Sequence, residues 1–345
     1  SFEDLEFGKE IIMNFKHTQS AHCESGVTVN LLAHQGLSLS EPMVFGIGSG
    51  IFFIHLPFVK LNGISATSYR IWPGGIFNRT MKLLGAEVVT KKFSSPHKSM
   101  EALDKLLEKN IPVGIMCSVY YLPYLPDAYR FHFNAHNIVI FGKEGDEYLV
   151  GDPVLHEVKR LHKDDLLKAR YAKGFPQPSG KLYYIKSLPN KEVDLKNAIR
   201  RGLKRTSFLI NRTPVGFIGV KAIGYLAKRL QNYPKTLGDR KSLLALGNLI
   251  RMQEEIGTGG GGFRFMYAAF LKESSKLIQN NELAKLSTEM TEIGDMWRDF
   301  AYNSAKIIKS RSSESNTFVE IGDKLALIGK REVDFFKSLG QVKII

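Results

Sequence analysis

The spacing of apolar residues changes near residue 190. Before this point, short apolar runs rich in β-branched and aromatic residues end at Gly, Pro or charged residues, a pattern typical of strands. The predicted strands cover residues 44–48, 113–119, 138–141, 148–150 and 182–185. Beyond residue 190, apolar residues recur three and four positions apart over residues 241–256, 263–280, 282–310 and 316–339. The change predicts a mixed α and β domain over residues 1–188 and an all-helical domain over residues 189–345.

One helical pattern lies within the first domain. From Glu24 to Gln35 the apolar residues follow helical spacing, and Gly36 then supplies a common helix end. Cys23 is therefore expected at the N-terminus of a helix, where backbone N–H groups and the helix dipole favour a thiolate. Most free cysteines are small buried apolar residues, and this interpretation stays open for Cys23. Cys117 lies in an apolar strand-like run and is predicted to belong to the core.

A predicted hairpin brings a histidine near a carboxylate. The two apolar runs on either side of Gly145 are typical of antiparallel strands joined by a short turn. A turn centred on Glu144 and Gly145 places His136 opposite Asp152 to within one residue, with Cβ atoms about 4.5–5.5 Å apart. A carboxylate there can accept a hydrogen bond from one imidazole nitrogen and leave the other to deprotonate a nucleophile.

Composition describes an ordinary folded chain with an uneven charge. The chain has 345 residues, 43% of them hydrophobic and 24% charged, and only two cysteines, which excludes a disulfide scaffold. The net charge is +14, of which residues 191–345 carry +11. This basic excess begins at Arg200, Arg201, Lys204 and Arg205. Such a surface attracts an acidic protein, an anionic membrane or nucleic acid, or it is simply a solvated helix face.

The sequence also predicts several absences. The long uncharged stretch over residues 42–59 contains glycines, prolines and His55, so we expect a buried strand and turn rather than a membrane span. The acidic N-terminus lacks a basic-then-apolar signal, so a cytoplasmic protein is expected. Neither a Cys-x-x-Cys nor a His-Glu-x-x-His motif occurs, and no metal site is predicted.

A glycine-rich segment over residues 257–262 separates two predicted helices. It lacks the Gly-Lys-Ser/Thr ending of a phosphate-binding loop. A flexible linker is one interpretation. The other is a substrate-binding segment, in which the backbone approaches a ligand closely and Arg264 adds positive charge near a pantetheine phosphate or an acyl carboxylate. The substrate-binding candidates are Gly259, Gly260, Gly261, Gly262 and Arg264.

Papain-like enzymes carry three functional groups in a fixed chain order: a cysteine at a helix start, then a histidine on a strand, then a carboxylate on the next strand. The segments Ala21-His22-Cys23-Glu24-Ser25, Asn134-Ala135-His136 and Gly151-Asp152-Pro153, followed by the glycine-rich motif in a helical tail, resemble the butirosin biosynthesis protein H (BtrH) family. The resemblance implies an α+β, papain-like (C39-like) domain with an antiparallel sheet and an N-terminal nucleophile helix, followed by an all-α domain.

The resemblance also implies an activity. The founding member of the family moves an aminoacyl group from an acyl carrier protein to an amine of an aminoglycoside. The leading hypothesis for this chain is therefore transfer of an acyl group from an acyl carrier protein thioester to an amine or hydroxyl acceptor, in a natural-product or lipid-tailoring pathway. Carried over to this sequence, Cys23 is the nucleophile, His136 the general base and acid, and Asp152 the orienting carboxylate. The implied partners are an acidic acyl carrier protein and a small-molecule acceptor, not nucleic acid. No cofactor is implied beyond the phosphopantetheine arm of the carrier.

The donor to the oxyanion departs from the papain-like pattern. Such enzymes commonly carry Gln six residues before the cysteine, whereas that position is His17 here and Gln19 stands four residues before. Gln19, His17 and His22 are candidates to act beside the backbone N–H of Cys23. The other interpretation of His17 and His22 is that they are solvent-facing loop residues, the more common place of a single histidine.

Two other functions remain open. A papain-like cysteine peptidase or amidase would use the same three residues with water as the acceptor. A carrier-protein-binding module without catalysis would need only the basic surface.

Overall fold

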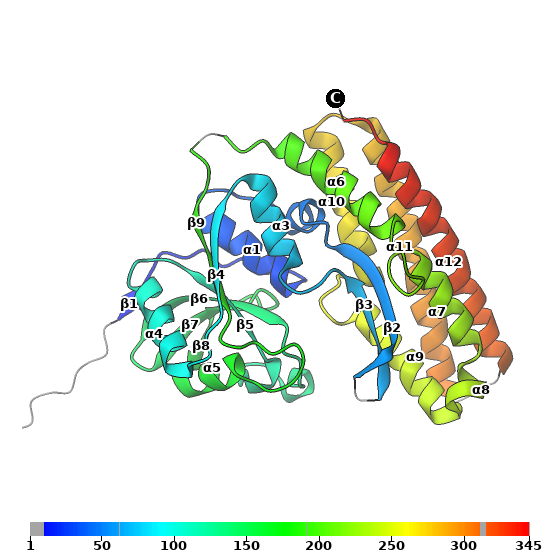
Figure 1. Ribbon diagram of the computed structural model, residues 1–345, viewed down its shortest axis with the longest axis horizontal. Helices are drawn as coiled ribbons and strands as arrows, with labels where there is room; N and C mark the ends of the chain where they lie inside the picture. The colour runs from blue at the N-terminus through cyan, green and yellow to red at the C-terminus, as the bar shows by residue number, and fades with distance from the viewer. Residues whose placement is uncertain (1–9, 62, 191, 311–314, 345) are drawn as a thin grey trace, which may run out of the picture. The chain divides into compact units, whose positions relative to one another are not determined.

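The computed structural model describes residues 10–61, 63–190, 192–310 and 315–344 (Figure 1). Its contacts divide the chain into two compact units. The first unit comprises Ser1–Glu41 and Leu84–Val193, and the second comprises Pro42–Leu83 and Asp194–Ile345. The sequence predicted two continuous domains meeting at residue 188. The units differ from that prediction because the segment Pro42–Leu83 packs with helices that lie much later in the chain.

The first unit is built on an antiparallel sheet with the strand order β4-β9-β5-β6-β7-β8, and β1 pairs with β6. The strands of this sheet are β1 (Ile11–Ile12), β4 (Glu87–Lys91), β5 (Val113–Cys117), β6 (His136–Glu144), β7 (Glu147–Gly151), β8 (Lys159–His162) and β9 (Leu182–Ser187). The central strand β5 is buried along its whole length, which explains its continuous apolar run. This sheet confirms the α+β class and the antiparallel arrangement.

Helix α1 (Cys23–His34) confirms the helix expected after Cys23. His22 precedes it in an extended conformation, and Gly36 follows its end with a positive φ of 84°. The helix is buried from Cys23 to Leu32 and packs against β6, so its first residue is held close to the sheet. The other helices of the unit are α4 (Pro96–Leu107), α5 (Lys163–Arg170) and the short 3₁₀ turns η1 (Val119–Tyr121) and η2 (Asp127–Tyr129).

The turn of the β6–β7 hairpin lies one residue later than predicted. Glu144 pairs with Glu147, so the turn consists of Gly145 and Asp146, with Gly145 at a φ of 57°. A bulge between Ile140 and Gly142 then changes the register once more.

The predicted cross-strand pair of His136 and Asp152 is wrong at the level of the backbone. Strand β7 ends at Gly151, which pairs with Val139, so Asp152 lies beyond the ladder. The ladder partner of His136 is Cys117 on β5. The later turn shifts every pair of the hairpin, and the strand ends before Asp152; apolar spacing alone fixes neither position.

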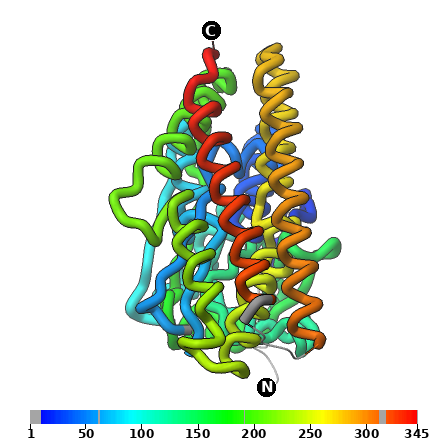
Figure 2. The backbone as a smooth tube through the Cα atoms, turned by 90° about the vertical axis from the view of Figure 1, so that its right-hand side faces the viewer, coloured from blue at the N-terminus to red at the C-terminus, as the bar shows by residue number. Residues whose placement is uncertain are grey.

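The second unit is mainly helical and contains one β-hairpin. Its elements are α2 (Glu41–Ile47), β2 (Ile51–Leu61), β3 (Ile64–Arg70), α3 (Gly75–Leu84), α6 (Leu195–Asn211), α7 (Lys221–Gln231), α8 (Tyr233–Leu237), α9 (Asp239–Glu254), η3 (Gly261–Phe263), α10 (Arg264–Leu277), α11 (Asn281–Ser310) and α12 (Ser315–Gln341). The long helices α11 and α12 run side by side (Figure 2). Helices α9 to α12 confirm the four predicted helices, whereas α6 and α7 were not singled out.

The predicted strand at residues 44–48 is wrong, because residues 44–47 belong to helix α2. A short apolar run that is buried on all sides has the same pattern in a strand and in a helix. Its burial explains its place in the second unit: Phe45 stacks on Phe263 with ring centroids 4.9 Å apart, and farther along Tyr69 meets Trp297 edge-on at 5.4 Å. Among the described residues, no helix is both long and apolar enough to cross a membrane.

Candidate active site

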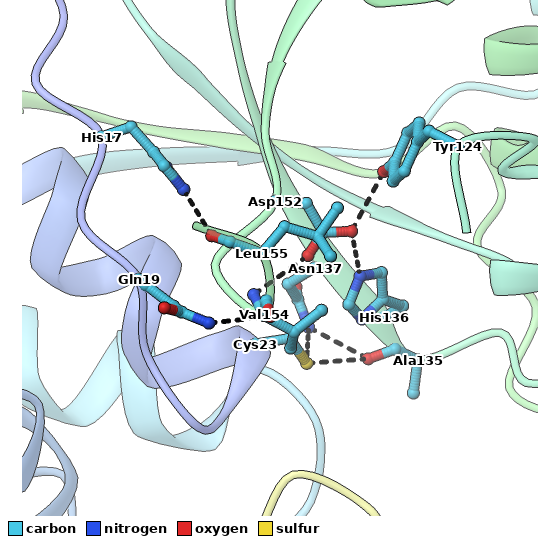
Figure 3. Close-up of polar contacts among 10 residues, drawn as sticks. All are labelled: His17, Gln19, Cys23, Tyr124, Ala135, His136, Asn137, Asp152, Val154 and Leu155. Carbon is cyan, nitrogen blue, oxygen red and sulfur yellow. Dashed lines mark hydrogen bonds and ion pairs between the residues drawn. The ribbon is translucent and has the colours of Figure 1, made fainter. Parts of the chain in front are cut away.

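Cys23 lies at the first position of α1, and its side chain is nearly buried, at 8% exposed (Figure 3). Its Sγ lies 4.0 Å from the carbonyl oxygen of Ala135 and 3.8 Å from Nδ2 of Asn137. The start of α1 comes close to the loop that follows Asp152, because a Cβ added at Gly26 would lie only 2.5 Å from the Cβ of Pro153. The glycine therefore allows the approach that brings Cys23 beside β6 and this loop.

His136 lies between a carboxylate and the sulfur. Its Nε2 donates a hydrogen bond to Oδ2 of Asp152 at 2.9 Å, and its ring interacts electrostatically with Cys23. Since Nε2 faces Asp152, Nδ1 is the nitrogen left to serve the thiol. His136 is 5% exposed and Asp152 is fully buried, so the ring is held between the two groups. The three predicted residues are thus brought together, with the carboxylate reaching the ring from the end of β7.

The electrostatics favour a protonated ring. Burial disfavours the imidazolium and by itself lowers the pKa of His136, but the charge of Asp152 and the hydrogen bonds to Asp152 and Cys23 outweigh it and raise the pKa to about 10. At neutral pH the ring therefore carries a positive charge next to Sγ. A neighbouring cation is one of the environments that stabilise a thiolate.

Asp152 has two further donors. The hydroxyl of Tyr124 donates to its Oδ2 at 3.0 Å, and the backbone N–H of Val154 donates to its Oδ1 at 3.3 Å. Burial and the charge of Asp152 raise the pKa of Tyr124 well above its usual range, which keeps the phenol a donor. Sequence reasoning missed Tyr124, because it lies in an irregular aromatic segment with no period to place it.

Asn137 is a second residue that sequence reasoning missed. Its buried amide donates to Sγ of Cys23 and, at 3.0 Å, to the carbonyl of Ala135, while its Oδ1 accepts from the hydroxyl of Tyr183 at 2.9 Å. The signal in the sequence is an amide inside an apolar strand, because such a group needs partners when buried. Asn137 thereby fixes one side of the space around the sulfur.

The three candidate oxyanion donors have different partners. His17 donates from Nε2 to the carbonyl of Leu155 at 2.9 Å, and Gln19 donates from Nε2 to the carbonyl of Val154 at 3.3 Å (Figure 3). Both side chains therefore hold the loop that follows Asp152. Gln19 is exposed, and its amide carries a second hydrogen that can donate elsewhere.

His22 caps helix α1 with its side chain. Its Nδ1 accepts a hydrogen bond from the backbone N–H of Ser25 at 3.3 Å. The sequence offered His22 as one of three candidate oxyanion donors, but in the structure Nδ1 of its ring faces the helix. The capping role could have been found from its position directly before the helix.

Arg264 lies in the interior of the second unit, paired with a carboxylate. It is fully buried, and its Nε and Nη2 each donate to Glu332 at 2.8 Å, while Nη1 donates to the carbonyl of Gly262 at 2.7 Å. Trp297 donates from Nε1 to the same Glu332 at 2.6 Å. The sequence assigned Arg264 to a phosphate or acyl carboxylate, but its guanidinium already satisfies Glu332, so the structure contradicts that assignment.

The glycines before Arg264 serve close packing in the same unit. Gly259, Gly260, Gly261 and Gly262 all have positive φ, which favours glycine. A Cβ at Gly262 would overlap the ring of Tyr69, and one at Gly261 would lie 2.9 Å from the ring of Phe265. The backbone does approach other groups closely, as expected, but at these two positions the groups are aromatic side chains of the protein.

Cys117 is fully buried, as predicted for a core residue, and burial raises the pKa of its thiol well above the ordinary value. Within the described part of the chain, no group of three or more His, Cys, Asp or Glu side chains could hold a metal ion.

Comparisons with known proteins relate both parts of the chain to families. Residues 22–153 match the family model "Butirosin biosynthesis protein H, N-terminal", and residues 164–339 match "Domain of unknown function (DUF4872)". No curated protein matches the chain. A crystal structure described as a C39-like peptidase from Bacillus anthracis is similar over 53% of this chain and 100% of that chain, with 16% sequence identity and a TM-score of 0.37.

Proposed function

This chain belongs to the butirosin biosynthesis protein H-like family, and we propose that it is a papain-like cysteine acyltransferase. It moves an acyl group from a carrier-protein thioester through Cys23 to an amine or hydroxyl acceptor, in a natural-product or lipid-tailoring pathway. The observation that carries the proposal is the buried pair of His136 and Asp152, joined at 2.9 Å, together with the electrostatic interaction of that ring with Cys23 at the start of α1. Nucleophile, base and orienting carboxylate are the parts that covalent acyl transfer requires.

The proposed reaction has two steps. The thiolate of Cys23 attacks the thioester carbonyl, and the carrier thiol leaves with the proton that His136 held as imidazolium. One thioester replaces another, so the acyl-enzyme forms at little cost in free energy. In the second step His136 takes a proton from the acceptor, whose nitrogen or oxygen attacks the acyl carbon and releases the thiolate of Cys23. Donors around the sulfur, with Gln19 and the N-terminus of α1 as candidates, would stabilise the oxyanion in both steps.

Helix α6 offers a docking face for an acidic carrier protein. Arg200, Arg201, Lys204 and Arg205 are all exposed on it, and Phe208, one turn beyond Lys204, is 56% exposed. Side chains four residues apart share one face of a helix, so the cations and the aromatic ring form a continuous surface. A basic surface with an aromatic anchor suits an acidic protein helix, because charge sets the encounter and the ring supplies apolar contact.

Intact mass spectrometry after incubation with an acyl-loaded carrier protein tests the reaction. We expect a mass increase of one acyl group on Cys23 that disappears when an amine is added and persists in buffer alone. Cys23→Ala should abolish the adduct without loss of folded structure, as checked by circular dichroism. Cys117→Ala is the matched control and should still form the adduct, because its thiol is fully buried.

The same experiment separates the other functions. Release of the acyl group by water at the rate seen with amine would support a peptidase or amidase instead. Absence of any adduct, together with carrier binding, would support a module without catalysis. Reversing the charge of Arg200, Arg201, Lys204 and Arg205 to Glu should weaken carrier binding most at low salt. An unchanged affinity would show that this face of α6 is only solvated.

A further inference from the structure

A single half-buried carboxylate, that of Glu41, holds the backbone directly before the nucleophile. Oε2 of Glu41 accepts a hydrogen bond from the N–H of Ala21 at 2.8 Å, and Oε1 accepts one from the N–H of His22 at 2.8 Å. Oε1 also accepts from the hydroxyl of Ser25, in the first turn of α1, at 2.9 Å. Three short bonds thus connect Glu41 to both sides of Cys23.

The position of this carboxylate is electrostatically unfavourable in two respects. Burial raises the pKa of Glu41 above its ordinary value, and the three hydrogen bonds from Ala21, His22 and Ser25 only partly offset this. A carboxylate near the start of α1 also adds negative charge close to a sulfur that must itself become negative. The arrangement is therefore unfavourable for the charge of the thiolate. Its benefit must lie in geometry.

The geometric benefit follows from the backbone. His22 is the N-cap of α1 with φ −116° and ψ 129°, so its orientation sets the direction in which Cys23 leaves the loop and enters the helix. Holding the N–H groups of Ala21 and His22 on the two oxygens of one carboxylate fixes both peptide planes. Reactivity depends steeply on such placement, since a displacement of about 1 Å can cost about 100-fold in rate.

We propose that Glu41 is a positioning residue that clamps the loop before Cys23 and holds the sulfur beside His136 and Asn137. The proposal rests on the role of Cys23 as nucleophile in the proposed function. It assigns Glu41 no contact with substrate and no proton transfer. The carboxylate acts only through the backbone of Ala21 and His22 and the hydroxyl of Ser25.

Glu41→Gln is the decisive variant, because an amide of the same shape can accept at one position only and directs N–H groups at a donor on the other. The rate constant for alkylation of Cys23 by iodoacetamide in the folded full chain should fall about 10- to 100-fold. The thiolate absorbance at neutral pH should persist, because His136 and Asp152 are untouched. In acyl transfer, kcat should fall while KM for the acyl carrier stays within about twofold.

Two further variants complete the test. Glu101→Gln makes the same chemical change on the exposed face of α4, where the carboxylate bonds only Lys105, and should alkylate at the parent rate. Ser25→Ala keeps both backbone bonds of Glu41 and should lose less than about fivefold. Should Glu41→Gln fail to fold, Glu41→Asp keeps the charge but is one methylene shorter, and it should show the same selective loss of rate.

An unchanged alkylation rate in folded Glu41→Gln, or a loss of thiolate absorbance equal to the loss of rate, would overturn the positioning role. The alkylation result does not depend on acyl transfer. A wild-type chain that alkylates readily at Cys23 but never forms an acyl adduct would refute the proposed function and leave the clamp standing.

Discussion

Replacing Asp152 by Asn tests the electrostatic basis of the site. The amide oxygen, placed where Oδ2 was, can still accept from Nε2 of His136 and from the hydroxyl of Tyr124, so the ring orientation is retained while one negative charge is removed. The amide NH2 replaces the acceptor of the longer bond from the N–H of Val154, so that 3.3 Å bond is lost. In the wild type this charge opposes the burial of the ring and holds the pKa of His136 at about 10. Without it, burial is the main remaining influence and drives the pKa of His136 below about 6.5.

The change in protonation gives an expected magnitude. At pH 7 the wild-type ring is almost entirely imidazolium, whereas a ring with a pKa below about 6.5 is charged in less than about a quarter of molecules. Without a neighbouring cation, a thiol of ordinary pKa near 8.5 is only about 3% ionised at pH 7. If the wild-type thiol is largely ionised, the variant should react with iodoacetamide about 30-fold more slowly at pH 7.

The pH dependence follows with its sign. The imidazolium is present below its pKa and is lost as the pH rises, so the wild type keeps its ion pair up to about pH 10 and the variant loses it above about pH 6.5. Above about pH 9 an ordinary thiol is ionised anyway, so the deficit of the variant should shrink toward a few-fold.

The rate of alkylation by iodoacetamide is measured from pH 5 to pH 10 by quenching samples at intervals and recording their intact mass. The variant His136→Gln should show a pH profile similar to that of Asp152→Asn. Equal rates for wild type and Asp152→Asn at pH 7 would refute the electrostatic reasoning. A deficit that stays constant at every pH would also contradict it, because misplacement rather than lost charge would then be the cause.

Three stability predictions concern other contacts. Tyr124→Phe removes a donor to the buried charge of Asp152 and should lower the free energy of unfolding of the first unit by about 1–3 kcal/mol, measured by urea denaturation. Glu332→Gln leaves the buried guanidinium of Arg264 without its counter-charge and should destabilise the second unit by about 3–5 kcal/mol in the same assay. Gly262→Ala forces a Cβ into an aromatic ring at a positive φ and should cost the second unit about 1–3 kcal/mol.

The control for Gly262→Ala is a glycine of the same unit that has free space around it. Gly224→Ala, in the middle of α7, meets no atom within 4 Å and should be neutral or stabilising by about 0.5–1 kcal/mol. A loss as large as that of Gly262→Ala would contradict the packing argument. Glu332→Gln with unchanged stability would show that the buried pair is replaceable, and Tyr124→Phe with unchanged stability would show that Asp152 is satisfied without the phenol.

Local patterns carried much of the fold. The helices α9 to α12 follow from residue spacing, because a helix with one buried face shows its period in the sequence. The strands β5 to β7 follow from short apolar runs rich in β-branched and aromatic residues, and the helix after Cys23 follows from helical spacing that stops at Gly36. Residues 44–47 form part of a helix, since burial on all sides removes the period. The basic surface of α6 also followed from the sequence, because charge is counted without knowledge of the fold.

The sequence by itself determined that a thiol at a helix start, an imidazole and a carboxylate are available in the order of a papain-like site. Only the tertiary structure decided how they meet: strand β7 ends at Gly151, so Asp152 lies beyond the strand ladder, and its carboxylate reaches His136 from the loop beyond β7. Tertiary packing also buried Arg264 against Glu332, and it brought Glu41 onto the loop of the nucleophile. These contacts join residues distant in sequence, and their partners are set by packing in three dimensions rather than by any local period.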